Sequence, residues 1–108
     1  MDKIELTIIQ ELVLNMIPRS SERPAKVVDI SAAIGMSERE INAVIRSLTM
    51  KGIPVCSLRS GENKGVFIPV SEQERSDGLV ALQNQATDMK QRIENVKKAD
   101  LNWHKKLA

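Results

Sequence analysis

The stretch Ile30–Leu48, with the sequence ISAAIGMSEREINAVIRSL, decides how this chain folds. Gly35 lies between two apolar helical patterns, and glycine accepts the positive φ that a tight corner between two helices needs. Ser37 and Glu40 form an S-x-x-E capping box, in which each side chain bonds a backbone donor near the other. The stretch therefore predicts two helices joined by a short turn.

The apolar side chains of this stretch fit two helices packed at a steep angle. The earlier helix is expected from Val27 to Ile34 and places Ile30 on its inner face. Met36 lies in the turn and is predicted to fill the space between the helices. The later helix ends before Gly52, and its apolar residues form one stripe at helical spacing: Ile41, Val44, Ile45 and Leu48.

The flanking segments complete a small domain. Residues 3–17 are predicted to form a first helix, which Pro18 ends. This helix has one broad apolar face: Ile4, Ile8, Ile9, Leu12, Val13 and Met16. Residues 53–59 and 66–70 are predicted strands, and the turn-rich loop 60–65 joins them as a hairpin. The predicted class is α+β, mainly α with a small β-hairpin, in the order of a winged helix-turn-helix.

The last third of the chain, from Ser71, is predicted to be one long helix of about 50 Å. Its apolar residues alternate in steps of three and four, with Asp100 as a charged interruption: Leu79, Leu82, Ala86, Met89, Ile93, Val96, Trp103 and Leu107. We therefore expect a winged-helix domain over 1–70 and, over 71–108, a helix that pairs as a coiled coil in a homodimer or binds another protein. Both partners remain open.

Composition narrows the class of protein. The 108 residues carry 16 basic and 14 acidic side chains, so a basic surface must come from arrangement and not from excess charge. The single cysteine excludes an internal disulfide and fits a reducing compartment. The N-terminus lacks a signal-peptide pattern, and no apolar run approaches the ~20 residues that span a bilayer. We expect a soluble cytoplasmic protein that does not associate with membranes.

The chain resembles a known family over about residues 5–70. The residues that carry the likeness are Ile34 to Leu48, then Gly52-Ile53-Pro54-Val55 and Gly65-Val66-Phe67-Ile68-Pro69. They look like the winged-helix N-terminal domain of the biotin-operon repressor type, and similar domains recur in small regulatory and replication proteins of bacteria and phages. The resemblance implies binding of double-stranded DNA. No counterpart of the large ligand-binding domain of those repressors is expected, so biotin chemistry is not carried over.

In such domains the third helix enters the major groove, and its N-terminal half meets base edges. The outward positions predicted to contact DNA are Ser37, Glu38, Arg39, Asn42, Ala43 and Arg46. Arginine bonds guanine bidentately and asparagine does the same to adenine, whereas Glu38 would repel phosphates unless it reads a cytosine amino group. An ordinary solvated helix face carries similar residues, so that interpretation stays open.

Two loops could add contacts to DNA. The wing offers Arg59, Asn63 and Lys64, for which backbone or minor-groove contact and a plain solvated hairpin are equally open. The segment before the second helix could position a phosphate or could be a solvated loop: Arg19, Ser20, Ser21, Arg23 and Lys26.

Catalytic chemistry has little support in the sequence. Cys56 and His104 are the single cysteine and histidine, they lie far apart, and no zinc spacing or phosphate-binding glycine loop occurs. We expect Cys56 to be a small core residue in a strand, and we expect no enzyme activity, no metal and no cofactor.

The expected function is sequence-specific binding of double-stranded DNA by a dimeric transcription regulator. The alternatives are a phage-type replication accessory protein and a winged-helix protein-interaction module that does not bind DNA.

Overall fold

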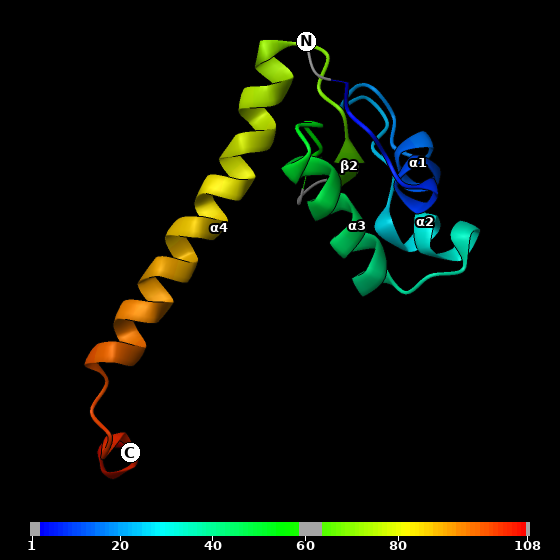
Figure 1. Ribbon diagram of the computed structural model, residues 1–108. Helices are drawn as coiled ribbons and strands as arrows, with labels where there is room; N and C mark the ends of the chain where they lie inside the picture. The colour runs from blue at the N-terminus through cyan, green and yellow to red at the C-terminus, as the bar shows by residue number, and fades with distance from the viewer. Residues whose placement is uncertain (1–2, 59–63, 108) are drawn as a thin grey trace.

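The computed structural model describes residues 3–58 and 64–107 (Figure 1). The elements follow in the order α1 (Ile8–Asn15), α2 (Val27–Ile34), α3 (Glu38–Met50), β1 (Cys56–Leu58), β2 (Gly65–Phe67), α4 (Glu72–Lys98) and the short 3-10 helix η1 (Trp103–Lys106). The strands form an antiparallel hairpin in which Cys56 lies opposite Phe67 and Leu58 opposite Gly65. The predicted class is confirmed: the fold is mainly α with one small hairpin and a long C-terminal helix.

The corner between α2 and α3 has the predicted geometry. Gly35 adopts the left-handed conformation with φ of +80°, and its N–H donates to the carbonyl of Ser31 at 2.9 Å. The hydroxyl of Ser37 accepts from the N–H of Glu40 at 3.1 Å, and the carboxylate of Glu40 accepts from the N–H of Ser37 at 3.2 Å. Because these bonds join residues close in sequence, the local sequence specifies the geometry of the corner.

The core lies between the first three helices and the hairpin. Its fully buried side chains come from every one of these elements except β1: Val13, Ile30, Ile41, Leu48 and Phe67. Met36 is partly buried and packs against this cluster, as the sequence predicts. Cys56 is also buried, in β1, as expected for a small core residue.

The first helix is shorter than predicted and turns a different face to the core. It begins after Thr7, because Thr7 and Gln10 form a capping box with bonds of 3.0 and 3.1 Å. Gln10 is buried, and its amide donates to the hydroxyl of Ser47 at 3.0 Å and accepts from Lys51 Nζ at 2.7 Å. Since every polar group of Gln10 is bonded, burying it costs little. The helix thus packs through Gln10 and Val13, and most of the predicted apolar face stays exposed.

The connector between α1 and α2 extends the hairpin, which the sequence did not indicate. Ala25 and Val66 exchange two backbone hydrogen bonds of 2.9 and 2.7 Å, and the N–H of Ile68 donates to the carbonyl of Pro18 at 2.8 Å. Both strands are three residues long, shorter than predicted, because the backbone beyond β2 pairs with this connector and not with β1.

The long helix ends earlier than predicted. Ala99 is extended, with ψ of 139°, and Asp100 accepts a hydrogen bond from the N–H of Asn102 at 2.8 Å. An aspartate that bonds nearby backbone competes with helical hydrogen bonds, so α4 stops at Lys98 and is about 40 Å long. Trp103 therefore lies on η1 and is not part of the apolar face of α4, contrary to the prediction.

The molecule is elongated. Its radius of gyration is 17.8 Å, whereas a compact domain of this length would have about 13 Å. Figure 1 shows the reason, because α4 leaves the body and carries the C-terminus to the far end. Within the described part of the chain, no helix has the length and apolar character needed to cross a membrane.

Candidate nucleic-acid interface

The outward face of α3 is open to solvent. All six residues predicted to contact DNA are exposed: Ser37, Glu38, Arg39, Asn42, Ala43 and Arg46. Arg39, Asn42 and Arg46 follow one another at steps of three and four and therefore share one face. The opposite face holds the fully buried Ile41 and Leu48. The helix is thus fixed on one side and presents two guanidinium groups and an amide on the other.

One groove brings together residues from the start of α2, the start of α3 and the hairpin. It has a volume of about 430 Å³ and is lined by Lys26, Val27, Val28, Glu38, Leu58, Lys64 and Gly65. Lys26 and Lys64, which are predicted to contact DNA, thus lie beside Glu38, whose negative charge is predicted to repel phosphates. None of these three charges has an ion-pair partner among the described residues.

A second, larger groove separates α3 from α4. Its volume is about 740 Å³, and its walls include Asn42, Ile45, Arg46 and Thr49 of α3 and Leu82 and Gln85 of α4. The hairpin forms the floor through Val55 and Cys56. Asn42 and Arg46 are therefore reached through a groove that has α4 as its far wall. The sequence did not reveal this wall, because it depends on how α4 docks.

The remaining predicted contacts are scattered. Arg59 and Asn63 lie outside the described residues. Arg19 and Arg23 are exposed on the connector and line neither of the two grooves. The hydroxyls of Ser20 and Ser21 donate to a carboxylate of this chain, so neither a phosphate contact nor a free solvated loop describes these two residues.

That carboxylate belongs to Glu74 in the first turn of α4. One oxygen accepts from the hydroxyl of Ser20 at 3.2 Å and from the N–H and hydroxyl of Ser21 at 3.1 and 3.0 Å. The other oxygen accepts from the N–H of Val70 at 3.0 Å. These bonds, that of Val70 foremost, hold the pKa of the Glu74 carboxyl below its ordinary value of 4.5. Glu74 thus ties the start of α4 to the connector, and we name this cluster the Glu74 latch.

Replacement of Glu74 by alanine is expected to lower the melting temperature at pH 7, since the charged carboxylate accepts all four bonds. Because the pKa is lower in the folded state, the stabilisation is present above pH 4.5 and is lost as the pH falls through the folded-state pKa. The melting temperatures of the wild type and of Glu74→Ala, measured by thermal unfolding from pH 7 to acid, should therefore converge below pH 4.5.

The matched control is Glu72→Ala in the same helical turn. Glu72 forms a surface ion pair with Arg75 at 3.3 Å, and its side chain is 84% exposed, so its removal should change the melting temperature little. If the difference in melting temperature between the wild type and Glu74→Ala persists unchanged in acid, the ionised carboxylate is not what stabilises the latch.

Gly78 sets how closely α4 approaches the hairpin, and it was not among the residues predicted to matter. A Cβ at this position would lie 2.5 Å from the Cβ and 2.7 Å from the Sγ of Cys56. The backbone of α4 therefore rests directly on β1, where burial raises the pKa of the Cys56 thiol and nearby Arg75 partly offsets the rise. The available signal was a glycine inside a helical pattern, which often marks a close approach.

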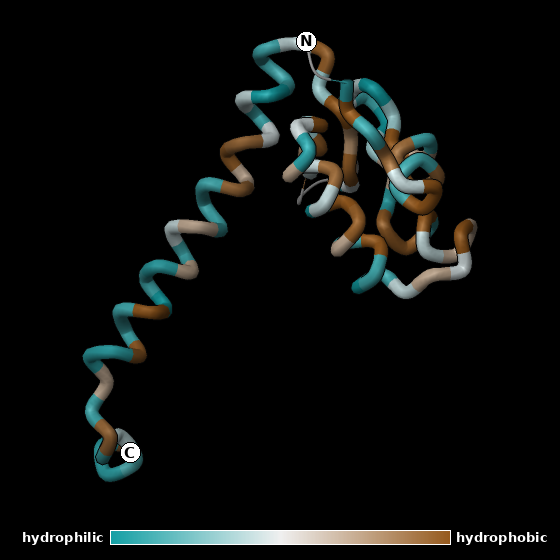
Figure 2. Tube along the Cα trace, in the orientation of Figure 1, coloured by the Kyte–Doolittle hydropathy of each residue, from teal (hydrophilic) through white to brown (hydrophobic). Residues whose placement is uncertain are grey.

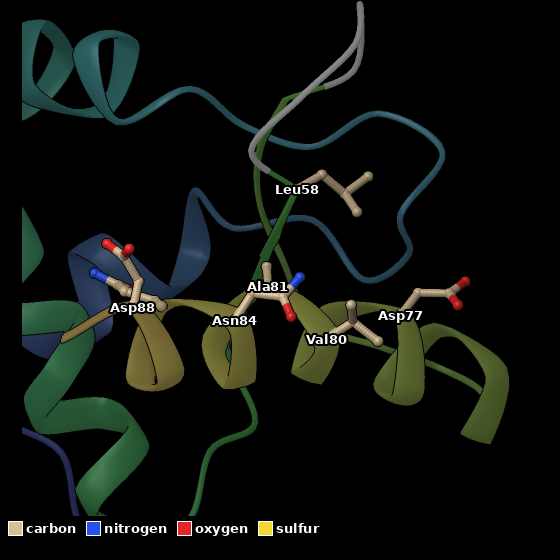
Figure 3. Close-up of a pocket in the computed structure, with 7 residues that line it drawn as sticks. Leu58, Asp77, Val80, Ala81, Asn84 and Asp88 are labelled. Atoms are coloured by element: carbon tan, nitrogen blue, oxygen red, sulfur yellow. The ribbon is translucent and has the colours of Figure 1, made fainter. Parts of the chain in front are cut away.

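Another hollow lies between α4 and the hairpin. Figure 3 shows Leu58 of β1 above Val80 and Ala81 of α4, with Asp77 and Asp88 toward the two ends. The hollow has a volume of about 520 Å³ and no basic side chain in its lining, so it does not suit a phosphate. Among the described residues, no group of three metal-ligating side chains occurs.

The predicted interface of α4 is exposed along the part that leaves the body, where brown apolar segments recur in Figure 2. Leu82 lines the groove toward α3, whereas Met89, Ile93 and Val96 are 47%, 48% and 77% exposed. Exposed apolar residues at heptad spacing indicate a surface that a partner covers.

No family model, curated protein or solved structure matches this chain. The functional conclusion therefore depends on the face of α3, the two grooves and the exposed part of α4.

Proposed function

We propose that this chain is a sequence-specific double-stranded DNA-binding protein of the cytoplasm that regulates transcription as a dimer. The observation that carries the proposal is the exposed row of Arg39, Asn42 and Arg46 on a helix fixed by buried Ile41 and Leu48. A rigid helix that presents arginine and asparagine at one-turn spacing suits base edges in the major groove.

The groove beside the start of α3 supports the same proposal. Lys26 and Lys64 lie in one groove, from segments far apart in the sequence, and neither has an ion-pair partner among the described residues. Two such lysines beside a recognition helix could each neutralise a phosphate and fix the register of the protein on the duplex.

A protein-interaction module is the second candidate, because two observations favour it. Glu38 lies in the groove with the two lysines and reduces its positive charge. The groove that holds Asn42 and Arg46 also contains the apolar Leu82, Ile45 and Val55, which suit a protein ligand. A replication accessory protein would share the DNA-binding surface and differ in the site that it recognises.

Fluorescence anisotropy of a mixed-sequence duplex library, titrated over a salt series, tests the proposal. We expect the logarithm of the binding constant to fall linearly with the logarithm of the salt concentration, with a slope of about −0.9 for each phosphate neutralised. The variant Lys26→Ala/Lys64→Ala should reduce the magnitude of that slope by about 2.

The matched control is Lys98→Ala, which removes a charge from the end of α4 outside both grooves. It should leave the slope unchanged. If the wild type does not bind DNA even at low salt, the interaction module is the better proposal.

A further inference from the structure

The face of α4 that docks on the hairpin continues beyond the body. Val96 follows Gly78 by about five full turns, so the two residues lie on the same side of the helix. Met89 and Ile93 lie beside that line, both on the same side of it. All three side chains are exposed because the body no longer reaches them. We call Met89, Ile93 and Val96 the free seam.

The charges beside the free seam are all basic. Lys90 and Lys97 lie along one edge and Arg92 along the other, and none of them has an ion-pair partner among the described residues. The acidic Glu94 lies away from the seam and pairs with Lys98 at 3.7 Å. Two free seams placed side by side would bring basic edges together, so pairing of α4 with α4 is disfavoured.

A complementary surface exists on α1. Its outward face carries Ile8, Ile9, Leu12 and Met16, which are 78%, 46%, 49% and 36% exposed, and we call these four residues the α1 patch. Glu11 is the one charged residue of α1, and it is exposed and without an ion-pair partner among the described residues.

Two further observations bear on what covers the α1 patch. Glu5 adds a second exposed acidic side chain just before the helix. Figure 1 shows α1 and the free part of α4 on opposite sides of the body, so they cannot meet within one chain.

We propose that the free seam of one copy covers the α1 patch of a second copy, and that the exchange is reciprocal. Each apolar surface then receives an apolar partner, and the basic edges of α4 meet Glu5 and Glu11. A two-fold axis relates the two identical contacts, which is the usual symmetry of a homodimer. The arrangement gives the proposed regulator its dimer but requires no DNA, so the two proposals can fail separately.

A charge exchange followed by sedimentation velocity tests the contact in the absence of DNA. The wild type should be a dimer at micromolar concentration. Glu5→Lys/Glu11→Lys and Lys90→Glu/Arg92→Glu should each weaken dimerisation by about 30-fold or more, because both contacts of each homodimer become repulsive. An equimolar mixture of the two variants should restore a dimer, since in the mixed dimer both contacts are again complementary.

Ile8→Asp provides a second variant, because Ile8 is 78% exposed and its replacement should leave the fold intact by circular dichroism while producing monomers. The matched control Glu22→Lys changes an exposed charge of the connector and should remain dimeric. A wild type that is monomeric at micromolar concentration would overturn the proposal. A dimer that resists the α1 variants but not the α4 variant would also overturn it, in favour of pairing of α4 with α4.

Discussion

Replacement of Gly78 by valine is expected to release α4 from the hairpin. Even the first side-chain carbon would lie 2.5 Å from the Cβ of Cys56, and that atom is fixed to the backbone of β1 and cannot turn away. The added methyl groups increase the overlap, so either the helix moves or the strand does. We expect the free energy of unfolding to fall by about 1–3 kcal/mol, the range typical of an overfilled interior.

The single cysteine reports this displacement directly. Cys56 is 6% exposed and lies beneath Gly78, so it should react slowly with a thiol reagent in the wild type. In Gly78→Val we expect labelling to accelerate by about tenfold or more, because local opening of α4 exposes the thiol. The measurement is the rate of thiol labelling under native conditions, together with urea unfolding.

Ser76→Val is the matched control, because it places the same β-branched side chain in α4 at an exposed position. Because serine and valine have similar helix propensities, it should leave both the helix and the labelling rate unchanged. Equal labelling rates in Gly78→Val and Ser76→Val would show that the contact between α4 and β1 does not depend on the missing side chain.

Replacement of Arg46 by alanine is expected to reduce specific DNA binding strongly. Arg46 is exposed on α3 one turn from Asn42, and both line the groove between α3 and α4. A bidentate contact from arginine to guanine contributes about 1–3 kcal/mol of discrimination, which corresponds to about 5- to 150-fold in affinity. The loss of affinity should be large for the preferred duplex and small for a scrambled duplex of equal length.

Arg75→Ala controls for the loss of positive charge alone. Arg75 lies on α4 and forms an exposed ion pair with Glu72, outside both grooves. It should leave the ratio of specific to nonspecific affinity unchanged. If Arg46→Ala also leaves this ratio unchanged, α3 does not read bases and the interaction module becomes the better proposal.

The parts of the fold that depend on neighbouring residues could be predicted from the sequence. The turn at Gly35 and the capping box of Ser37 and Glu40 are local, because every bond in them joins residues at most five positions apart. The same locality placed α2, α3 and the start of α4 correctly. The outward position of Arg39, Asn42 and Arg46 also followed from helical periodicity.

Local chemistry also caused two of the errors. Thr7 and Gln10 start α1 later than the apolar pattern suggested, and the buried amide of Gln10 shifts the inner face so that Val13 is the one residue of the expected apolar face that is buried. Asp100 ends α4 before Trp103, although the heptad pattern continues past it. In both cases hydrogen bonds of polar side chains outweighed the apolar periodicity.

The site itself depended on contacts between distant segments. The Glu74 latch joins residues more than fifty positions apart, and Gly78 brings α4 onto β1. These contacts place Leu82 and Gln85 opposite Asn42 and Arg46, while the hairpin brings Lys64 beside Lys26. A pattern along one segment carries no information about which other segment it will meet. The outward face of α3 follows from helical periodicity, whereas the grooves around it exist because segments distant in the sequence pack together.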